Sequence, residues 1–185
     1  MEIELDAAAK DKRLNRLVAL TVVVLSIFMG LSQVKDGNIV QAMQQAQSNA
    51  VDRWNEYQAA RIKLHVDEAA LGQIQAIAPT NPAALAETTR LTSEILKYRR
   101  ETPDLRKQAL AEQAQYDALN VHDDQFDASD ALISIAISIS AVAALTESFA
   151  ALIAAWAFGA GGLIMGVAGF TGASLHSDFL SRLLS

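Results

Sequence analysis

The sequence contains no cysteine and only three prolines, nine glycines and three histidines in 185 residues. Without cysteine the chain has no disulfide framework and no thiol chemistry. It also lacks a nucleophile beside a base, a glycine-rich phosphate loop, zinc-ligand spacing and a basic patch suited to nucleic acid. We therefore expect a protein that is not an enzyme, with no catalytic residue, no cofactor, no metal site and no nucleic-acid partner.

Charge is missing from two long stretches, although the whole chain carries a formal net charge of −6. The first stretch, residues 17–34, has about the length that one helix needs to cross a bilayer. The second, residues 131–175, contains Glu147 as its one charged residue, and its roughly 45 residues suffice for two crossings. With "TES" (146–148) as the turn, the sequence predicts transmembrane helices at 17–34, 131–146 and 149–171.

A cleavable signal peptide is the alternative for the first stretch, because basic residues precede an apolar segment. The apolar segment is long, however, and Gly30–Ser32 is its one near-match to a cleavage site. These two features favour an uncleaved anchor.

The basic residues before the first span predict its orientation in the membrane; they are Lys10, Lys12, Arg13 and Arg16. No lysine or arginine occurs in "HDDQFDASD", which leads into the second span. Lysine and arginine close to span ends are retained in the cytoplasm. We therefore expect residues 1–16 and the Glu147 turn in the cytoplasm, with residues 35–130 and the C-terminus on the opposite side.

Residues 35–130 show apolar positions at helical spacing and no strand pattern. One heptad-like series is Met43, Ala50, Tyr57, Leu64 and Leu71, and a second is Leu91, Ile95, Tyr98, Thr102, Leu105, Ala109, Glu112, Tyr116 and Leu119. Between them, Pro79 can end one helix while Asn81 and Pro82 start the next. The pattern predicts an antiparallel, coiled-coil-like helical hairpin with its turn near 78–82, and a kink rather than a loop at Pro103.

The segment "DRWNEYQAARIK" (52–63) follows the first span and resembles a family of bacterial three-span inner-membrane proteins known as a domain of unknown function. The resemblance covers most of the chain, and its specific residues are Trp54, Tyr57, Gln58, Ala59 and Lys63. It implies a three-span architecture and no activity. Together with the orientation given above, we expect a multi-pass protein of the bacterial inner membrane with the hairpin in the periplasm. Family members often carry basic residues in the last turn, where this chain has Thr146 and Glu147.

Six of the nine glycines lie between Ala155 and Ser174, in an apolar segment. Small residues recur there at steps of four and three, forming one stripe: Ala155, Gly159, Gly162, Gly166, Gly169 and Ala173. In lipid such a stripe lets helix backbones approach closely. We expect it to pack against the second span or a neighbouring copy, the alternative being glycines that line a pore or bend in gating.

Acidic residues suggest a possible cation site, and the candidates are Asp123, Asp124, Asp127, Asp130 and Glu147. Those before the second span could attract cations at a pore mouth, whereas solvated acids near a helix start are the simpler interpretation. Glu147 either caps a helix end at the interface or forms an intramembrane proton or cation site.

Aromatic and apolar residues of the hairpin are the candidates for self-association: Trp54, Tyr57, Leu64, Leu91, Ile95 and Tyr98. Packing in the hairpin core is the simpler role for the aromatic pair, and ligand binding the alternative. Residues 174–185 predict a short amphipathic helix on the membrane surface. Lys97–Glu101 is expected to be a solvated face.

The fold class predicted is therefore an all-α membrane protein with three transmembrane helices and a long helical hairpin between the first two. We expect a membrane-anchored structural or interaction protein in the lipid bilayer that forms a symmetric homo-oligomer through its glycine-packed spans and hairpin. The alternative is a ring-shaped cation channel or stator-like subunit. No other protein partner can be named from the sequence.

Overall fold

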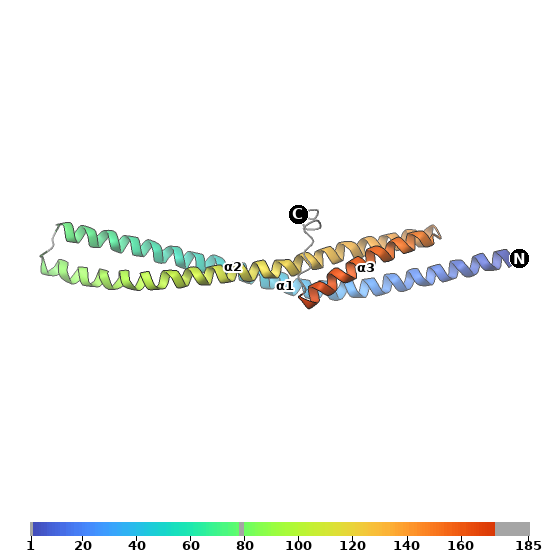
Figure 1. Ribbon diagram of the computed structural model, residues 1–185, viewed down its shortest axis with the longest axis horizontal. Helices are drawn as coiled ribbons and strands as arrows, with labels where there is room; N and C mark the ends of the chain where they lie inside the picture. The colour runs from blue at the N-terminus through green and yellow to red at the C-terminus, as the bar shows by residue number, and fades with distance from the viewer. Residues whose placement is uncertain (1, 78–79, 173–185) are drawn as a thin grey trace. The chain divides into compact units, whose positions relative to one another are not determined.

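The computed structural model describes the backbone of residues 2–77 and 80–172, and the side chains from residue 12 onward within these ranges. Three helices account for nearly all of them: α1 (Glu2–Ile77), α2 (Pro82–Leu145) and α3 (Phe149–Thr171) (Figure 1). Within these two ranges no residue is in a strand. The predicted all-helical class is confirmed.

The start of α2 is fixed by Asn81 and Pro82. The Asn81 carbonyl accepts a hydrogen bond from the Leu85 amide, and its side-chain Oδ1 accepts one from the Ala83 amide, both at 2.9 Å. Asn81 is thus an N-cap, and Pro82 occupies the first helical position, where its missing N–H costs nothing. The two residues act as the sequence predicts, while Pro79 lies outside the described residues.

The helix α2 continues through Pro103 without a loop. Proline has no amide hydrogen, so one backbone acceptor a turn earlier loses its partner. The Thr102 hydroxyl donates to the Tyr98 carbonyl at 2.6 Å, beside this gap. The hydrogen bond holds the threonine side chain against its own helix, so Thr102 does not act as the N-cap of a new one.

A tight turn joins α2 to α3. Glu147 adopts a left-handed conformation (φ 53°), and the Ser148 amide donates to the Ala143 carbonyl at 3.0 Å. The Ser148 hydroxyl then accepts from the Ala151 amide at 3.3 Å, which caps α3. This turn is short enough to make α2 and α3 antiparallel neighbours.

The chain divides into two compact units, one formed by Met1–Ala42 with Ala118–Ser185 and the other by Met43–Asp117. We call them the span unit and the arm unit. All three expected spans belong to the span unit, which also includes about two turns of α1 beyond residue 34 and about three turns of α2 before residue 131. Helical structure therefore continues past the apolar segments at both places.

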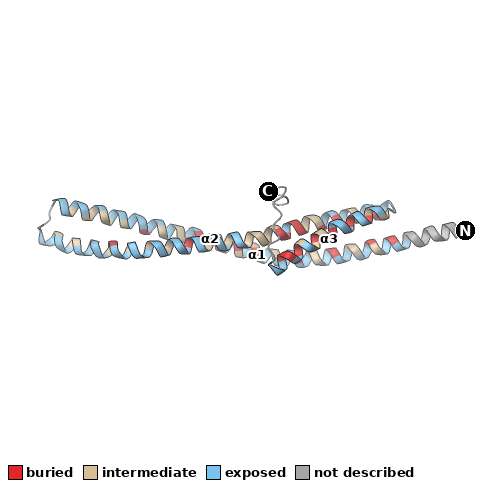
Figure 2. Ribbon diagram, in the orientation of Figure 1, coloured by how far each residue is buried: buried red, intermediate tan, exposed pale blue. Residues whose placement is uncertain are grey.

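Apolar side chains form the core of the span unit and cover much of its outside. Leu14 and Val18 of α1 pack with Ala143 and Leu152 at one end. Leu25 packs with Ile133 and Ala136 further along. Large apolar residues of α1 such as Leu31 remain 62% exposed, and Figure 2 shows exposed and buried positions interleaved along all three helices. The three helices are long and apolar enough to cross a membrane, as expected of a membrane protein.

The two heptad-like series follow the less exposed sides of α1 and α2 through the arm unit, and the last member, Leu119, lies just inside the span unit. All of their members are buried or half-buried, including Met43, Leu91 and Ala109. Contacts join the two segments along their length: Asn49 Nδ2 to Glu112 Oε2 at 3.3 Å, and Arg99 Nη2 to Glu68 Oε1 at 2.6 Å. The heptad spacing thus identifies the facing sides of α1 and α2.

Candidate functional site

The small-residue stripe of α3 packs against the other two spans of the same chain. A Cβ at Gly162 would lie 2.6 Å from Ile133 Cγ1 and 3.0 Å from the Ser129 carbonyl, both on α2. A Cβ at Gly166 would lie 2.5 Å from Phe28 Cε1 on α1. Real Cβ atoms do not come this close, so only glycine fits. The second span and also the first are therefore the partners of this stripe.

The remaining members of the stripe follow the same pattern. A Cβ at Gly159 would meet Leu25 Cδ1 at 3.1 Å, and one at Gly169 would meet the Phe126 ring at 2.9 Å. Ala155 is fully buried. Ala173 lies outside the described residues. The glycines thus serve intrachain packing throughout the described part of the stripe.

Aromatic rings close this interface at the end of α3. The Phe126 and Phe170 rings meet edge to face at 5.1 Å, and Phe28 meets Phe170 in the same way at 6.2 Å. Edge-to-face pairs are favoured because the positive edge of one ring meets the negative face of the other. One residue from each helix takes part, so the three helices are held in register there.

Next to the aromatic cluster, four aspartates gather at this end of the span unit. Asp123, Asp127 and Asp130 belong to α2, as the sequence indicates, and α1 adds Asp36, whose side chain hydrogen-bonds that of Asp123. Asp130 Oδ2 accepts from Gln33 Nε2 at 3.0 Å. The sequence analysis missed Asp36, although its position two residues after the first span was a usable signal. Antiparallel spans bring the end of one next to the start of the other.

The clustering perturbs the acidity of these carboxyl groups. Burial, followed by the charges of Asp123 and Asp127, raises the pKa of Asp36 from 3.8 to about 6. Burial also raises the pKa of Asp123 and of Asp127, where neighbouring acids add to the effect. One proton shared between Asp36 and Asp123 would remove their mutual repulsion. The chemistry available here is proton binding between helices near neutral pH.

A metal site does not follow from this cluster. Across the described residues, no group of three or more His, Cys, Asp or Glu side chains is arranged to hold a metal ion. Asp124 is engaged with Asn120 on its own helix, at 3.5 Å. Asp127 is exposed. Among the described aspartates, Asp36 and Asp123 are joined by a hydrogen bond between their side chains.

Glu147 lies at the opposite end of the span unit from the aspartates. It is exposed in the turn, beside the end where Ala143 and Leu152 pack on Leu14. Eighteen residues of α2 follow Asp127 before the turn, which is about 27 Å along the helix. The structure therefore does not bring the five candidate acids together, and Glu147 stands at a helix end.

The six hairpin candidates lie along or beside the facing sides of the arm unit. Leu91 and Ile95 are buried, and the other four are half-buried. The Trp54 and Tyr57 rings meet edge to face at 5.5 Å on the same helix. Lys63 Nζ lies 5.7 Å from the centre of the Tyr98 ring across the pair. These contacts occur within one chain, as expected for core residues.

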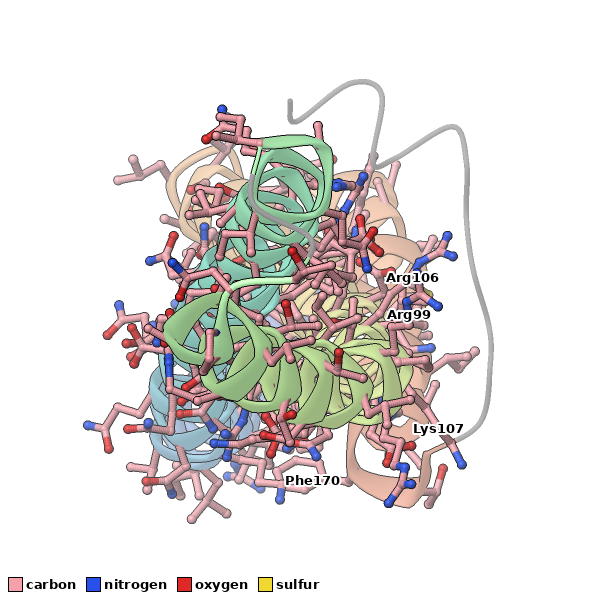
Figure 3. All side chains as sticks on the ribbon, turned by 90° about the vertical axis from the view of Figure 1, so that its left-hand side faces the viewer. Arg99, Arg106, Lys107 and Phe170 are labelled. Carbon is pink, nitrogen blue, oxygen red and sulfur yellow. The ribbon has the colours of Figure 1, made fainter. Side chains whose placement is uncertain are left out.

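The basic stretch of α2 is solvated, as expected for Lys97–Glu101. Arg99 pairs with Glu68, and Arg99, Arg106 and Lys107 lie on the outside of the helices (Figure 3). No described acid forms an ion pair with Arg106 or Lys107. Exposed pairs of this kind add little stability.

A groove between α1 and α3 of the span unit escaped the sequence analysis. Its volume is about 330 Å³, and its lining residues are Leu20, Thr21, Val24, Leu25, Trp156, Gly159, Ala160 and Leu163. No sequence pattern marks it, because it depends on which faces of α1 and α3 come together.

The comparisons with known proteins give one family. No curated protein and no solved structure matches the chain significantly. A family profile described as "Domain of unknown function (DUF4337)" matches residues 14–172, which include all three expected spans and the arm unit. The chain therefore belongs to the DUF4337 family of unknown function.

Proposed function

We propose that the protein is a membrane-anchored structural or interaction protein whose span unit holds an extramembrane helical hairpin. The observation that carries this proposal is the contrast between the two units. The span unit exposes large apolar side chains such as Ile27 and Leu31 along α1, whereas the arm unit interleaves charged residues with a thin apolar seam. Exposed apolar surface of the first kind suits lipid, and a charged surface suits water.

Self-association is the second part of the proposal, through the outer face of the arms. Leu85, Leu96 and Leu110 of α2 are 53%, 47% and 47% exposed. At 100° per residue they fall within about 40° of one another, on a stripe away from the seam. A two-helix hairpin has little core of its own, so covering this stripe in a symmetric homo-oligomer would stabilise it. The glycines are occupied within the chain, which leaves the arms as the favoured interface.

The orientation proposed places the basic end of the span unit in the cytoplasm of a bacterial cell and the arms in the periplasm. Arg13 and Arg16 lie at the same end as the Glu147 turn, and the aspartates lie at the other. Basic residues flanking short cytoplasmic segments support this orientation. No enzymatic activity is part of the proposal.

The test is the mass of the detergent-extracted full chain. An assembly larger than a monomer is expected, and Leu96→Glu should reduce it to monomers because it places a charge within the apolar stripe. Gln108→Glu adds the same charge at an exposed position of α2 away from the stripe and should leave the assembly intact. A monodisperse monomer for the unmodified chain would exclude self-association.

A cation channel remains the second candidate, and the carboxyl cluster favours it. Copies surrounding an axis would gather several sets of Asp36, Asp123 and Asp127 at one pore mouth. Cation flux into liposomes that is abolished by Asp127→Asn would support a channel. A well-formed oligomer without flux would leave the structural role.

A further inference from the structure

The groove between α1 and α3 offers a surface suited to hydrocarbon. Six of its lining residues are aliphatic or glycine, and the other two are joined by a hydrogen bond in which the Trp156 indole Nε1–H donates to Thr21 Oγ1 at 2.9 Å. A chain entering the groove therefore meets an indole N–H that already has its acceptor. In a bilayer such a chain gains dispersion contacts without desolvating anything.

Small residues of α3 create the groove. Gly159 sits against Leu25, where a Cβ would approach Cδ1 to 3.1 Å, so the helices are close there. Ala160 is exposed on the same side of α3, and its side chain ends at one methyl. On α1 the lining runs from Leu20 to Leu25, about 7.5 Å along the helix. The result is a short channel bounded by Leu20, Val24 and the Trp156 ring.

Positively charged side chains of α1 lie beyond one end of this groove. Arg13 precedes Leu20 by seven residues and falls on the face of α1 that lines the groove, while Arg16, four residues before Leu20, lies about 40° beyond the edge of that face. Both are exposed, and neither forms an ion pair with an acid in the described part of the chain. The first turn of α3 packs at the same end, through Phe149, and the helix dipole adds positive potential there.

We propose that the groove binds an acyl chain of an anionic phospholipid whose phosphate is held by Arg13 and Arg16. The arginines lie one to two helical turns beyond the groove, about the span of a glycerol backbone, and a guanidinium presents paired N–H donors to phosphate oxygens. Charge complementarity selects this occupant over a zwitterionic lipid or the neutral spans of a second copy. The inference rests on the spans crossing a bilayer and is independent of self-association.

The test uses Trp156 as the reporter. The chain has two tryptophans, so Trp54→Phe leaves Trp156 alone in the groove. The full-length variant is placed in phosphatidylcholine vesicles that contain either phosphatidylglycerol or phosphatidylcholine with brominated acyl chains, which quench indole fluorescence on contact. Quenching by the brominated phosphatidylglycerol is expected at about a fivefold lower mole fraction, as one or two interfacial arginines predict.

Matched variants distinguish the effect of the two arginine charges on lipid binding from the effect of the shape of the groove. In the Trp54→Phe background, Arg13→Gln with Arg16→Gln should erase the preference, and Arg13→Lys with Arg16→Lys should keep most of it. Ala160→Phe fills the groove and should protect Trp156 from both lipids. Ala154→Phe, an exposed position on the opposite side of α3, should not.

Four results would overturn the proposal. Equal quenching by the two lipids, or a preference that survives removal of both arginines, would exclude a phosphate site. Absence of quenching by either lipid in protein that floats with the vesicles would mean that a second copy covers the groove. Protein that does not float with the vesicles would instead contradict the membrane spans themselves.

Discussion

Ser129 Oγ on α2 donates a hydrogen bond of 2.8 Å to the backbone carbonyl of Gly162 on α3. A side chain can reach the backbone of a neighbouring helix only where the two axes approach closely. The missing side chain of Gly162 permits that approach, since a Cβ there would lie 3.2 Å from the Ile133 amide nitrogen. The pair marks a close approach of α2 and α3 and explains why glycine is tolerated in a long apolar helix.

Gly162→Ala should destabilise the protein even though alanine is the better helix former. The added methyl would meet Ile133 Cγ1 at 2.6 Å and backbone atoms at 3.0 and 3.2 Å, and backbone cannot move aside cheaply. We expect a loss of about 1–3 kcal/mol, typical of overpacking. Thermal unfolding in detergent, followed by circular dichroism, measures the change.

Gly30→Ala is the matched control within the first span. A Cβ at Gly30 has no neighbouring atom within 4 Å, so the substitution should be neutral or stabilising by up to about 1 kcal/mol. We therefore predict that Gly162→Ala lowers the stability of the protein, whereas Gly30→Ala leaves it unchanged or raises it. If both variants unfolded at the same temperature, the close packing of α3 would be contradicted.

Ser129→Ala should weaken the contact between α2 and α3 by a smaller amount. Interhelical side-chain hydrogen bonds in membrane proteins contribute about 0.6 kcal/mol on average. Ser140 is equally buried, but its hydroxyl donates to the Ala136 carbonyl of its own helix, at 2.8 Å. Ser140→Ala should therefore cost less than Ser129→Ala in the same unfolding assay, and a larger loss for Ser140→Ala would count against this assignment.

The Asp36–Asp123 pair should make stability fall as pH rises from about 4 to 6. The pKa of Asp36 is raised to about 6 in the folded protein, so between these pH values the folded state binds more protons than the unfolded state. Stability then decreases with pH and levels off above the folded pKa. Unfolding temperatures measured from pH 4 to 8 test the direction.

Asp36→Asn should flatten that pH profile and raise stability at pH 7 by roughly 1 kcal/mol, a value reduced for solvent screening. Asp104→Asn removes an exposed carboxylate in the arm unit and should leave the profile unchanged. A profile that keeps its slope in the Asp36 variant would show that other groups cause it.

Much of the fold could be predicted because the periodicity of apolar residues and the spacing of small residues are visible within a short stretch of sequence. The glycine stripe identifies the buried side of α3, and the two heptad-like series identify the facing sides of the arm unit. Asn81 and Pro82 predict the start of α2, because capping depends on adjacent residues.

The features that escaped prediction depend on contacts between distant segments. The pKa of Asp36 is raised first by burial and then by the acids of α2, nearly ninety residues away in sequence, so α1 alone does not reveal it. The groove needs Leu20 and Val24 to face Trp156 and Ala160, which only the packing of α1 on α3 determines. The sequence also did not show that α1 is one continuous helix. The end of an apolar stretch marks where the surroundings of the chain change from lipid to water, and the helix itself continues.

Single-cysteine labelling tests the central claim that three spans separate the α2–α3 turn from the arms. The chain has no cysteine, so Thr146→Cys in the turn and Gln113→Cys in the arm unit each give one exposed thiol. In intact bacterial cells, a membrane-impermeant maleimide should label Gln113→Cys directly and Thr146→Cys only after permeabilisation. Labelling of both positions from the same side of the membrane would contradict the account.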